Sequence, residues 1–318
     1  LDLPPAITPL SRRFEMARMI GQDFSGLFDR EMTLPYALEL ADALGGFIDS
    51  CQIEEIEDLG RVANLVQGDL ALHWEKSARF LSAAVEAWPK RLAELGLMDP
   101  AARRAKLLRL LAERWDAHPP AGPVIAAGST GSAPAAAAVL GAVARAPMGC
   151  VVLPGLDHAL SDDVWTSIGA GTDPEEQHPQ SVLWRLLQSN NVLRDTVRLW
   201  PGEARPADSD ALGQARQRLI NEALRPADAT ADWRTEIDNL RRDAQGSGVA
   251  DPIALGTQGL SLVTARTEED AASTIAVLMR QALETPGQTC ALVTPDLALG
   301  RRVEARLLRW GITPDSSA

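Results

Sequence analysis

The sequence Val124-Ile-Ala-Ala-Gly-Ser-Thr-Gly-Ser132, followed by Cys150-Val-Val-Leu-Pro-Gly-Leu-Asp157, points most directly to the fold of this chain. Each stretch is a short apolar run that ends in a turn rich in Gly, Ser or Pro, and an Ala-rich helical pattern lies between them. This order is typical of two parallel strands joined by a helix, and α/β proteins place ligands in the loops at such strand ends. We therefore expect a strand–loop–helix–strand unit with a candidate ligand loop at Gly128–Ser132.

The sequence before this unit predicts helices, because apolar residues recur at helical spacing and no β-alternation is visible. Pro119-Pro-Ala-Gly-Pro123 interrupts this pattern and marks a boundary. The helices expected before it cover Ser11–Ile20, Leu34–Ser50, Leu59–Leu95 with a break near Pro89, and Pro100–Trp115.

A second alternation of strand and helix patterns occupies the end of the chain. Leu260–Thr264 and Thr289–Thr294 predict strands, and Thr267–Glu284 and Leu297–Trp310 predict helices. The expected class is α/β but mostly helical overall, with two RecA-like parallel units and large all-helical insertions, as in superfamily 1 helicases. The expected divisions are a helical insertion at 1–118, part of a first lobe at 119–160, a helical and loop segment at 161–256, and part of a second lobe at 257–318.

The amino-acid composition limits which classes of protein this chain can belong to. The chain has 318 residues and a net charge of −12, whereas a stand-alone nucleic-acid binder is normally basic. Any role with nucleic acid is therefore expected to use a local groove, or to rely on parts of a larger assembly that this chain does not contain. Three scattered cysteines favour a reducing, cytoplasmic setting over a disulfide framework, and no apolar run is long enough to span a membrane. Both ends look cut, which suggests a segment of a longer protein. We expect no metal site.

The loop after the first strand has three interpretations. Its amides and hydroxyls at a helix N-terminus suit a phosphate of a DNA strand, or a phosphate of a nucleotide. Without a lysine, however, the loop departs from the usual nucleotide cradle. The third interpretation is a plain strand-to-helix turn in which Ser132 caps the helix beginning at Pro134. The candidate phosphate-binding residues of this loop are Gly128, Ser129, Thr130, Gly131 and Ser132.

Other polar groups have structural and functional interpretations side by side. We expect Asp157–His158 to form an Asx turn rather than an acid–base pair, and His178 to cap its helix. Glu268–Asp270 suits the first turn of a helix, and Thr294-Pro-Asp296 suits a helix cap, although Thr294 could also face nucleic acid. The basic stripe of the last helix is either a solvated face or a contact to the DNA backbone or a partner; it comprises Arg302, Arg306 and Arg309.

A set of motifs in fixed order resembles one family across essentially the whole chain. After the two stretches quoted first come His178-Pro-Gln180, Glu222-Ala-Leu-Arg-Pro226 with Thr230 and Trp233, Ala291–Asp296, Trp310-Gly-Ile312 and Asp315-Ser316. Together they look like the AddB subunit of the AddAB helicase–nucleases, in its alphaproteobacterial form. Each motif is weak alone, and the specificity lies in their order and spacing.

The resemblance implies a role in processing double-strand DNA ends for recombinational repair. It implies an AddA-like helicase–nuclease subunit and single-stranded or duplex-end DNA as partners. ATP with magnesium, and an iron–sulfur cluster, would belong to parts of the family outside this segment. Where an active motor has an Asp-Glu pair after a strand, this chain has Ala126-Ala127, so we expect no ATPase activity from it. We expect no nuclease activity either, because the resemblance places the family's nuclease domain outside this segment. The alternatives are a nucleotide- or phosphate-binding α/β enzyme that uses Gly128–Ser132, and a purely structural interaction module.

Overall fold

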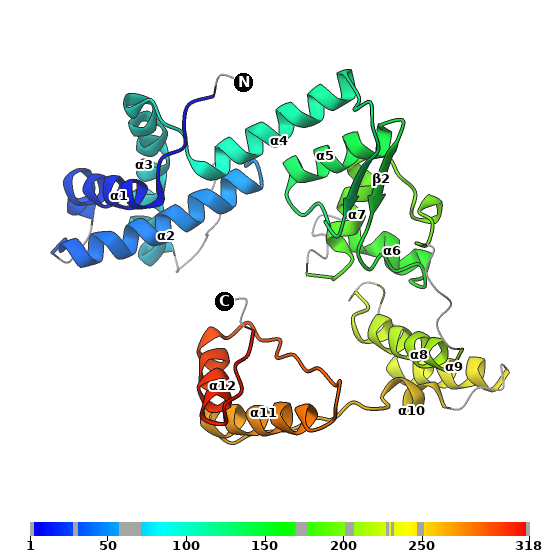
Figure 1. Cartoon of the computed structure of the whole chain (residues 1–318). Coiled ribbons are helices and arrows are strands. Elements are labelled where there is room, and N and C mark those ends of the chain that lie inside the picture. The colour runs from blue at the N-terminus through cyan, green and yellow to red at the C-terminus, as the bar shows by residue number, and fades with distance from the viewer. Residues whose placement is uncertain are drawn as a thin grey trace. The chain divides into compact units, whose positions relative to one another are not determined.

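The computed structural model describes residues 3–27, 31–56, 71–169, 177–200, 207–226, 229, 232–246 and 251–315. Contacts between Cα atoms group the chain into two units, Leu1–Gly256 and Thr257–Ala318. The described elements are mostly helices, with one small parallel sheet (Figure 1). The expectation of a mostly helical α/β protein is confirmed at this level.

The first unit begins with a group of helices whose starts follow from local sequence. Thr8 and Thr33 accept backbone N–H bonds at the N-termini of α1 (Pro9–Asp23) and α2 (Leu34–Ile53), and each helix has a proline in its first two positions. Both features favour helix initiation. With α3 (Ala71–Leu95), α1 and α2 bury a core that includes Met16, Ile20, Leu44, Ile48, Ala84 and Trp88.

The predicted break near Pro89 is wrong, because α3 continues through Pro89 to Leu95. A proline inside a helix costs roughly 3 kcal/mol. Trp88 and Leu92, on either side of it, are both buried in the core. We attribute the continuity of the helix to this packing. The predicted start of this helix, residues 59–70, lies outside the described residues.

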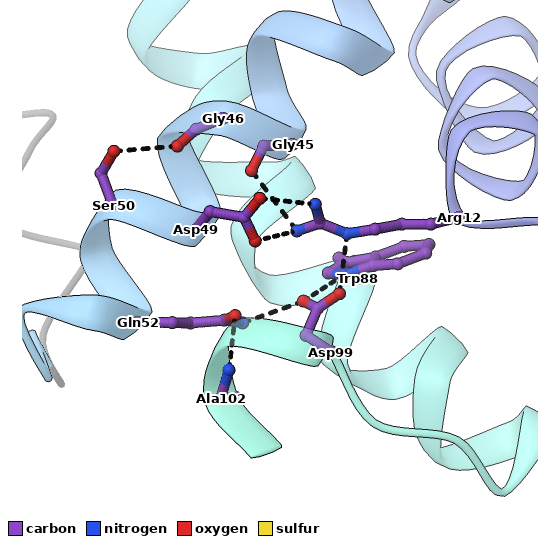
Figure 2. A network of polar contacts seen from close by, with 9 residues as sticks. All are labelled: Arg12, Gly45, Gly46, Asp49, Ser50, Gln52, Trp88, Asp99 and Ala102. Atoms are coloured by element: carbon purple, nitrogen blue, oxygen red, sulfur yellow. Dashed lines mark hydrogen bonds and ion pairs between the residues drawn. The ribbon is translucent and has the colours of Figure 1, made fainter. Parts of the chain in front are cut away.

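A buried polar network joins four helices near the start of α4 (Pro100–Ala117), as Figure 2 shows. Asp99, 1% exposed, accepts hydrogen bonds from Arg12 Nε at 2.8 Å, Trp88 Nε1 at 2.8 Å and Gln52 Nε2 at 2.9 Å. Arg12 also pairs with Asp49 at 2.8 Å and donates to the Gly45 carbonyl. These bonds satisfy a carboxylate that would otherwise be costly to bury.

The predicted strand–loop–helix–strand unit is confirmed. Strand β1 (Val124–Ala127) pairs in parallel with β2 (Gly149–Val152), and α5 (Pro134–Arg145) connects them. Ala126 and Val151 pack against α5 and against α7 (Ser181–Ser189). On the other face, Ile125, 64% exposed, and Cys150 lie open. One face of the two-stranded sheet is therefore covered by helices and the other is not.

The described remainder of the first unit consists of helices and loops. Helix α6 (Asp162–Gly169) packs against α7, and α8 (Ala207–Ala223) follows. α9 (Trp233–Gly246) and α10 (Pro252–Gly256) follow, and α10 contacts both α8 and α9. Two short 3-10 helices cover Ser25–Leu27 and Arg194–Thr196.

The second unit contains the two predicted helices. Helix α11 (Glu268–Leu283) packs on α12 (Leu297–Arg309) through Ala272, Ala276, Val303 and Leu307. Thr267 caps α11 by accepting the Asp270 amide N–H, and Asp296 caps α12 by accepting two amides. The predicted cap at Thr294-Pro-Asp296 and the predicted acidic first turn of α11 are confirmed.

The two strands predicted in the second unit are not formed. Leu260–Thr264 and Thr289–Thr294 lie within the described residues, and neither belongs to a hydrogen-bonded strand. Leu262 and Val293 are each 93% exposed. A strand exists only when a neighbour supplies its ladder of hydrogen bonds, and no described residue supplies one here. The apolar sequence pattern was right for a strand, but the pairing is missing.

Candidate functional site

The loop between β1 and α5 is the first part of the site. Gly128 and Gly131 both have positive φ, 80° and 64°, a conformation that favours glycine. A Cβ on Gly131 would lie only 2.8 Å from Leu186 Cδ1, so the buried Leu186 side chain would have to shift to admit it. The Ser129 hydroxyl accepts the Gly131 amide N–H at 3.3 Å. The glycines therefore give the loop a tight path against α7.

The loop leads into a helix N-terminus that no side chain caps. The N-cap residue of α5 is Ala133, so the prediction that Ser132 caps this helix is wrong. Ser132 lies one residue too early to occupy the capping position. Pro134 has no amide N–H, and the first amides of a helix have no partner within it. Ser132 is exposed and, among the described residues, its hydroxyl has no hydrogen-bond partner.

Gly131 and Ser132 border a cavity of about 420 Å³. The cavity lies between α4, α5 and α7, and it carries three arginines against two carboxylates. Its charged lining residues are Arg109, Glu113, Asp116, Arg145 and Arg185. The structure thus brings two residues of the predicted loop next to three cations that are distant in the sequence.

The other three loop candidates do not border this cavity. Gly128 and Ser129 are exposed, and Thr130 is half-buried beside the buried Gly131. None of the three is among the residues that line the cavity. The Thr130 hydroxyl has no hydrogen-bond partner among the described residues, whereas Ser129 is engaged with the Gly131 amide. Of the five predicted loop residues, Gly131 and Ser132 are therefore the two that border this cavity.

The three arginines differ in their availability. Arg109 pairs with Glu55 through Nε at 2.9 Å, and this hydrogen bonding raises the pKa of Arg109 above its ordinary value. Arg145 pairs with Asp116 at 2.9 Å. Arg185 is exposed and makes no ion pair or hydrogen bond with the described residues. Arg185 is therefore the arginine of this cavity that forms no ion pair with a described residue.

Asp157 and its neighbours form a structural turn. Asp157 accepts the Ala159 amide N–H at 2.8 Å, as an Asx turn requires, and the Gln217 side-chain amide at 2.6 Å. The predicted Asx turn is confirmed. From the His178-Pro-Gln180 motif, Gln180 accepts the Asp157 amide N–H and donates to the Gly155 carbonyl. This motif holds the turn after β2.

His178 and the Glu222–Pro226 motif also make local contacts. His178 Nδ1 accepts the Gln180 amide N–H at 3.1 Å, although the N-cap of α7 is Gln180 itself. Arg225 pairs with Glu222 at 2.7 Å, three residues away on the chain. Thr230 and Ser316, which belong to the resembling motif set, lie outside the described residues.

The arginines of the predicted basic stripe on the last helix differ in whether they form ion pairs. Arg302 pairs with Glu268 and Arg306 with Glu269, so both arginines tie α12 to α11. Arg309 is exposed and has no partner among the described side chains. Thr294 accepts the Asp296 amide N–H at 3.1 Å next to the cap of α12. Of the candidate residues in this unit, Arg309 alone keeps an unpaired charge within the described structure.

No signal in the sequence predicted the cavity itself. Arg185 follows Leu183-Trp184 within an amphipathic helix, where an isolated arginine is ordinarily a solvated side chain. Its position on the same cavity as Gly131 follows from the packing of α7 against α5. Trp165 is buried beneath Arg194, with 5.2 Å between the guanidinium carbon and the ring centroid, so its ring is not open to a nucleic-acid base. Trp200 is instead among the exposed aromatic side chains.

Other kinds of site are absent from the described ranges. These residues hold no group of three or more His, Cys, Asp or Glu side chains arranged to bind a metal ion. None of their helices combines the length and apolar character needed to cross a bilayer. The chain was also compared with protein-family models, with curated proteins and with solved structures, and none of them matches it.

Proposed function

We propose that this chain is a non-catalytic scaffold that guides single-stranded DNA, as the central part of an AddB-like subunit in double-strand break repair. The DNA backbone would pass the cavity beside Gly131, Ser132 and Arg185. The proposal rests on the ordered motif set and on the geometry of this cavity. It includes docking on an AddA-like helicase–nuclease subunit in the cytoplasm.

The observation that carries the proposal is the combination of three groups at one cavity. The N-terminus of α5 lacks a capping side chain, Ser132 offers a hydroxyl without a described partner, and Arg185 offers an unpaired charge. Helix N-termini and arginines both bind phosphate groups, the latter through two parallel N–H donors. A phosphodiester of a DNA strand has the charge and acceptor atoms that this combination suits.

The absence of catalysis is proposed from residue identity. Strand β1 ends in Ala126-Ala127, where a motor strand would have the acidic pair that handles magnesium and water. Asp157, the acid that follows β2, is already engaged by Ala159 and Gln217. Methyl groups cannot polarise a water molecule, so the α/β unit would retain its shape without ATP hydrolysis.

The second unit is proposed as part of a second RecA-like lobe. Its order of apolar segment, helix, apolar segment and helix is that of a βαβα unit. The exposed Leu262 and Val293 suit strands that form when a neighbouring strand is present. We propose residues 119–160 as part of the first RecA-like lobe of the same DNA-guiding scaffold.

Equilibrium binding of a fluorescein-labelled oligothymidylate tests the proposal. Arg185→Gln is expected to weaken binding about threefold to tenfold and to reduce the slope of log K against log salt by about 0.7, the loss of one phosphate contact on a single strand. Arg218→Gln, an exposed arginine of α8 outside the cavity lining, is the matched control and should bind as the parent does. Equal effects of both variants, or no binding of DNA by the parent, would refute the role of the cavity.

A second candidate is a nucleotide- or phosphate-binding enzyme that uses the same loop. The size of the cavity, about 420 Å³, favours it, because small-ligand sites commonly have volumes of this order. Magnesium-dependent ATP turnover that Arg185→Gln abolishes would establish this candidate and overturn the scaffold. If neither DNA nor nucleotide binds, and an AddA-like subunit binds tightly, the chain is a structural interaction module.

A further inference from the structure

Strand β2 has a free edge. The Val124 and Gly128 amides donate to the Met148 and Val152 carbonyls, so the even-numbered residues of β2 direct their backbone groups toward β1. Backbone groups alternate in direction along a strand, so Val151 directs its N–H and C=O away from β1. Among the described residues, nothing bonds to these two groups.

A groove of about 790 Å³ runs along this edge. Its lining includes every residue from Gly149 to Leu153 and no residue of β1, which places the groove on the side of β2 that faces away from β1. The ends of α5 and α7 line part of it, and residues 197–200 line another part. The apolar lining side chains include Leu140, Leu186, Leu187, Val192, Leu199 and Trp200.

One charged group of the groove has no described partner. Arg198 lines the groove, is exposed, and makes no ion pair or hydrogen bond with the described residues. Asn190, which also lines the groove, already donates to the Leu186 carbonyl at 2.9 Å. The groove therefore combines apolar walls, an unpaired strand edge and one unpaired positive charge.

We propose that the free edge of β2 binds an extended peptide of a partner protein as a third strand. The peptide would have apolar residues at alternating positions and a carboxylate that faces Arg198. Strand addition uses main-chain hydrogen bonds for affinity and side-chain pockets for specificity, and the groove offers both. A third strand would also supply bonds to the backbone N–H and C=O of Val151, which have no partner among the described residues.

The geometry favours a single strand over other occupants. Residues 197–200 line the groove together with β2 and the ends of α5 and α7. The unpaired N–H and C=O of Val151 favour a peptide backbone over a purely apolar small molecule. The proposal is independent of the phosphate cavity, because Arg198 and Val151 do not line it.

Fluorescence anisotropy with synthetic peptides and the full chain tests the proposal. The probes are labelled peptides of alternating Val and Thr, with Glu residues at one end or at the other, because either strand direction can add to an edge. The matched control probe has N-methyl groups at alternate amides, which remove backbone donors while keeping the side chains. We expect an acidic peptide to bind and its N-methylated form to bind at least about tenfold more weakly.

Reversing the charge at Arg198 is the second part of the peptide-binding experiment. Arg198→Glu is expected to weaken the acidic peptide about tenfold, and replacing Glu by Lys in the peptide should restore binding to this variant. Arg218→Glu, an exposed control outside the groove, should change nothing. Hydrogen exchange of residues 149–153 should slow on addition of the acidic peptide, because a bonded amide exchanges slowly.

Several results would overturn the proposal. These are equal binding of the N-methylated peptide, equal effects of the two arginine reversals, or no binding of any acidic peptide. A hydrophobic dye that binds where peptides do not would identify a small-molecule cavity. A dimer whose population rises with concentration, and that Arg198→Glu disrupts, would identify a second copy of the chain as the occupant. Unfolding curves of both variants check that the fold is retained.

Discussion

Asp99 shows how one residue can organise a group of helices. It stands at the N-terminus of α4 and accepts bonds from Arg12 of α1, Gln52 of α2 and Trp88 of α3 (Figure 2). Each donor is distant in the sequence or lies on another helix. Since a buried carboxylate is stable only with such partners, the network fixes how these helix ends meet.

Removal of this carboxylate should be costly. Asp99→Ala is expected to lower the free energy of unfolding by about 3 kcal/mol, because it leaves the buried Arg12 with Asp49 as its remaining carboxylate and the Trp88 N–H without an acceptor. Urea unfolding followed by circular dichroism measures the change. Asp42→Ala is the control, since Asp42 forms an exposed pair with Arg13 and should cost less than about 1 kcal/mol. Similar losses for both variants would contradict the role of the network.

At the scale of single elements, the N-termini of α5 and α12 make a contrasting pair. Asp296 accepts the Ala298 and Leu299 amides at 2.8 and 3.2 Å, whereas Ala133 offers α5 no side-chain acceptor. The first backbone N–H groups of a helix need hydrogen-bond acceptors, and a side chain supplies one in α12 but not in α5. The open end belongs to the helix that faces the candidate phosphate cavity.

Substitutions at these two positions should have opposite signs. Asp296→Ala is expected to cost about 1 kcal/mol of helix stability, and Ala133→Ser to contribute roughly 0.5–1 kcal/mol, because it adds a capping hydroxyl. Hydrogen exchange of the first turns of α12 and α5, measured by mass spectrometry, reports each effect locally. A loss of protection in α5 on Ala133→Ser would show that this end of the helix is not open in the way described.

The whole molecule consists of two units with unequal cores. The Leu1–Gly256 unit holds several buried clusters, whereas the core of the Thr257–Ala318 unit comprises Ala272, Ala276, Val303 and Leu307. Small domains with small cores are marginally stable. The second unit also exposes Leu262 and Val293, whose burial would have contributed to its stability.

The two units should therefore unfold separately. We expect the amides of α11 and α12 to exchange faster than those of α1 and α2 by at least about tenfold, which corresponds to a difference of roughly 1.4 kcal/mol in opening free energy. A chain ending at Gly256 should keep the urea midpoint of the first transition. One common exchange rate for both units, or a lowered midpoint after truncation, would show that they fold as one.

The features that local sequence could predict are those that depend on neighbouring residues. The strands β1 and β2 with their connecting helix follow from apolar runs, turn glycines and an alanine-rich pattern. The Asp296 cap and the Asx turn at Asp157 follow because the side chain bonds to backbone groups two or three residues away. Short-range bonds of this kind leave a clear signature in the order of residue types.

Contacts between residues that are distant in the sequence could be identified only from the folded chain. The pairing of Arg302 and Arg306 with Glu268 and Glu269, and the approach of Arg185 to Gly131, depend on how helices pack. Leu260–Thr264 has the composition of a strand but lacks the neighbour that would bond to it. Helix starts and turns are encoded locally, whereas strand pairing, ion pairs and cavities arise from surfaces that meet only after the chain has folded.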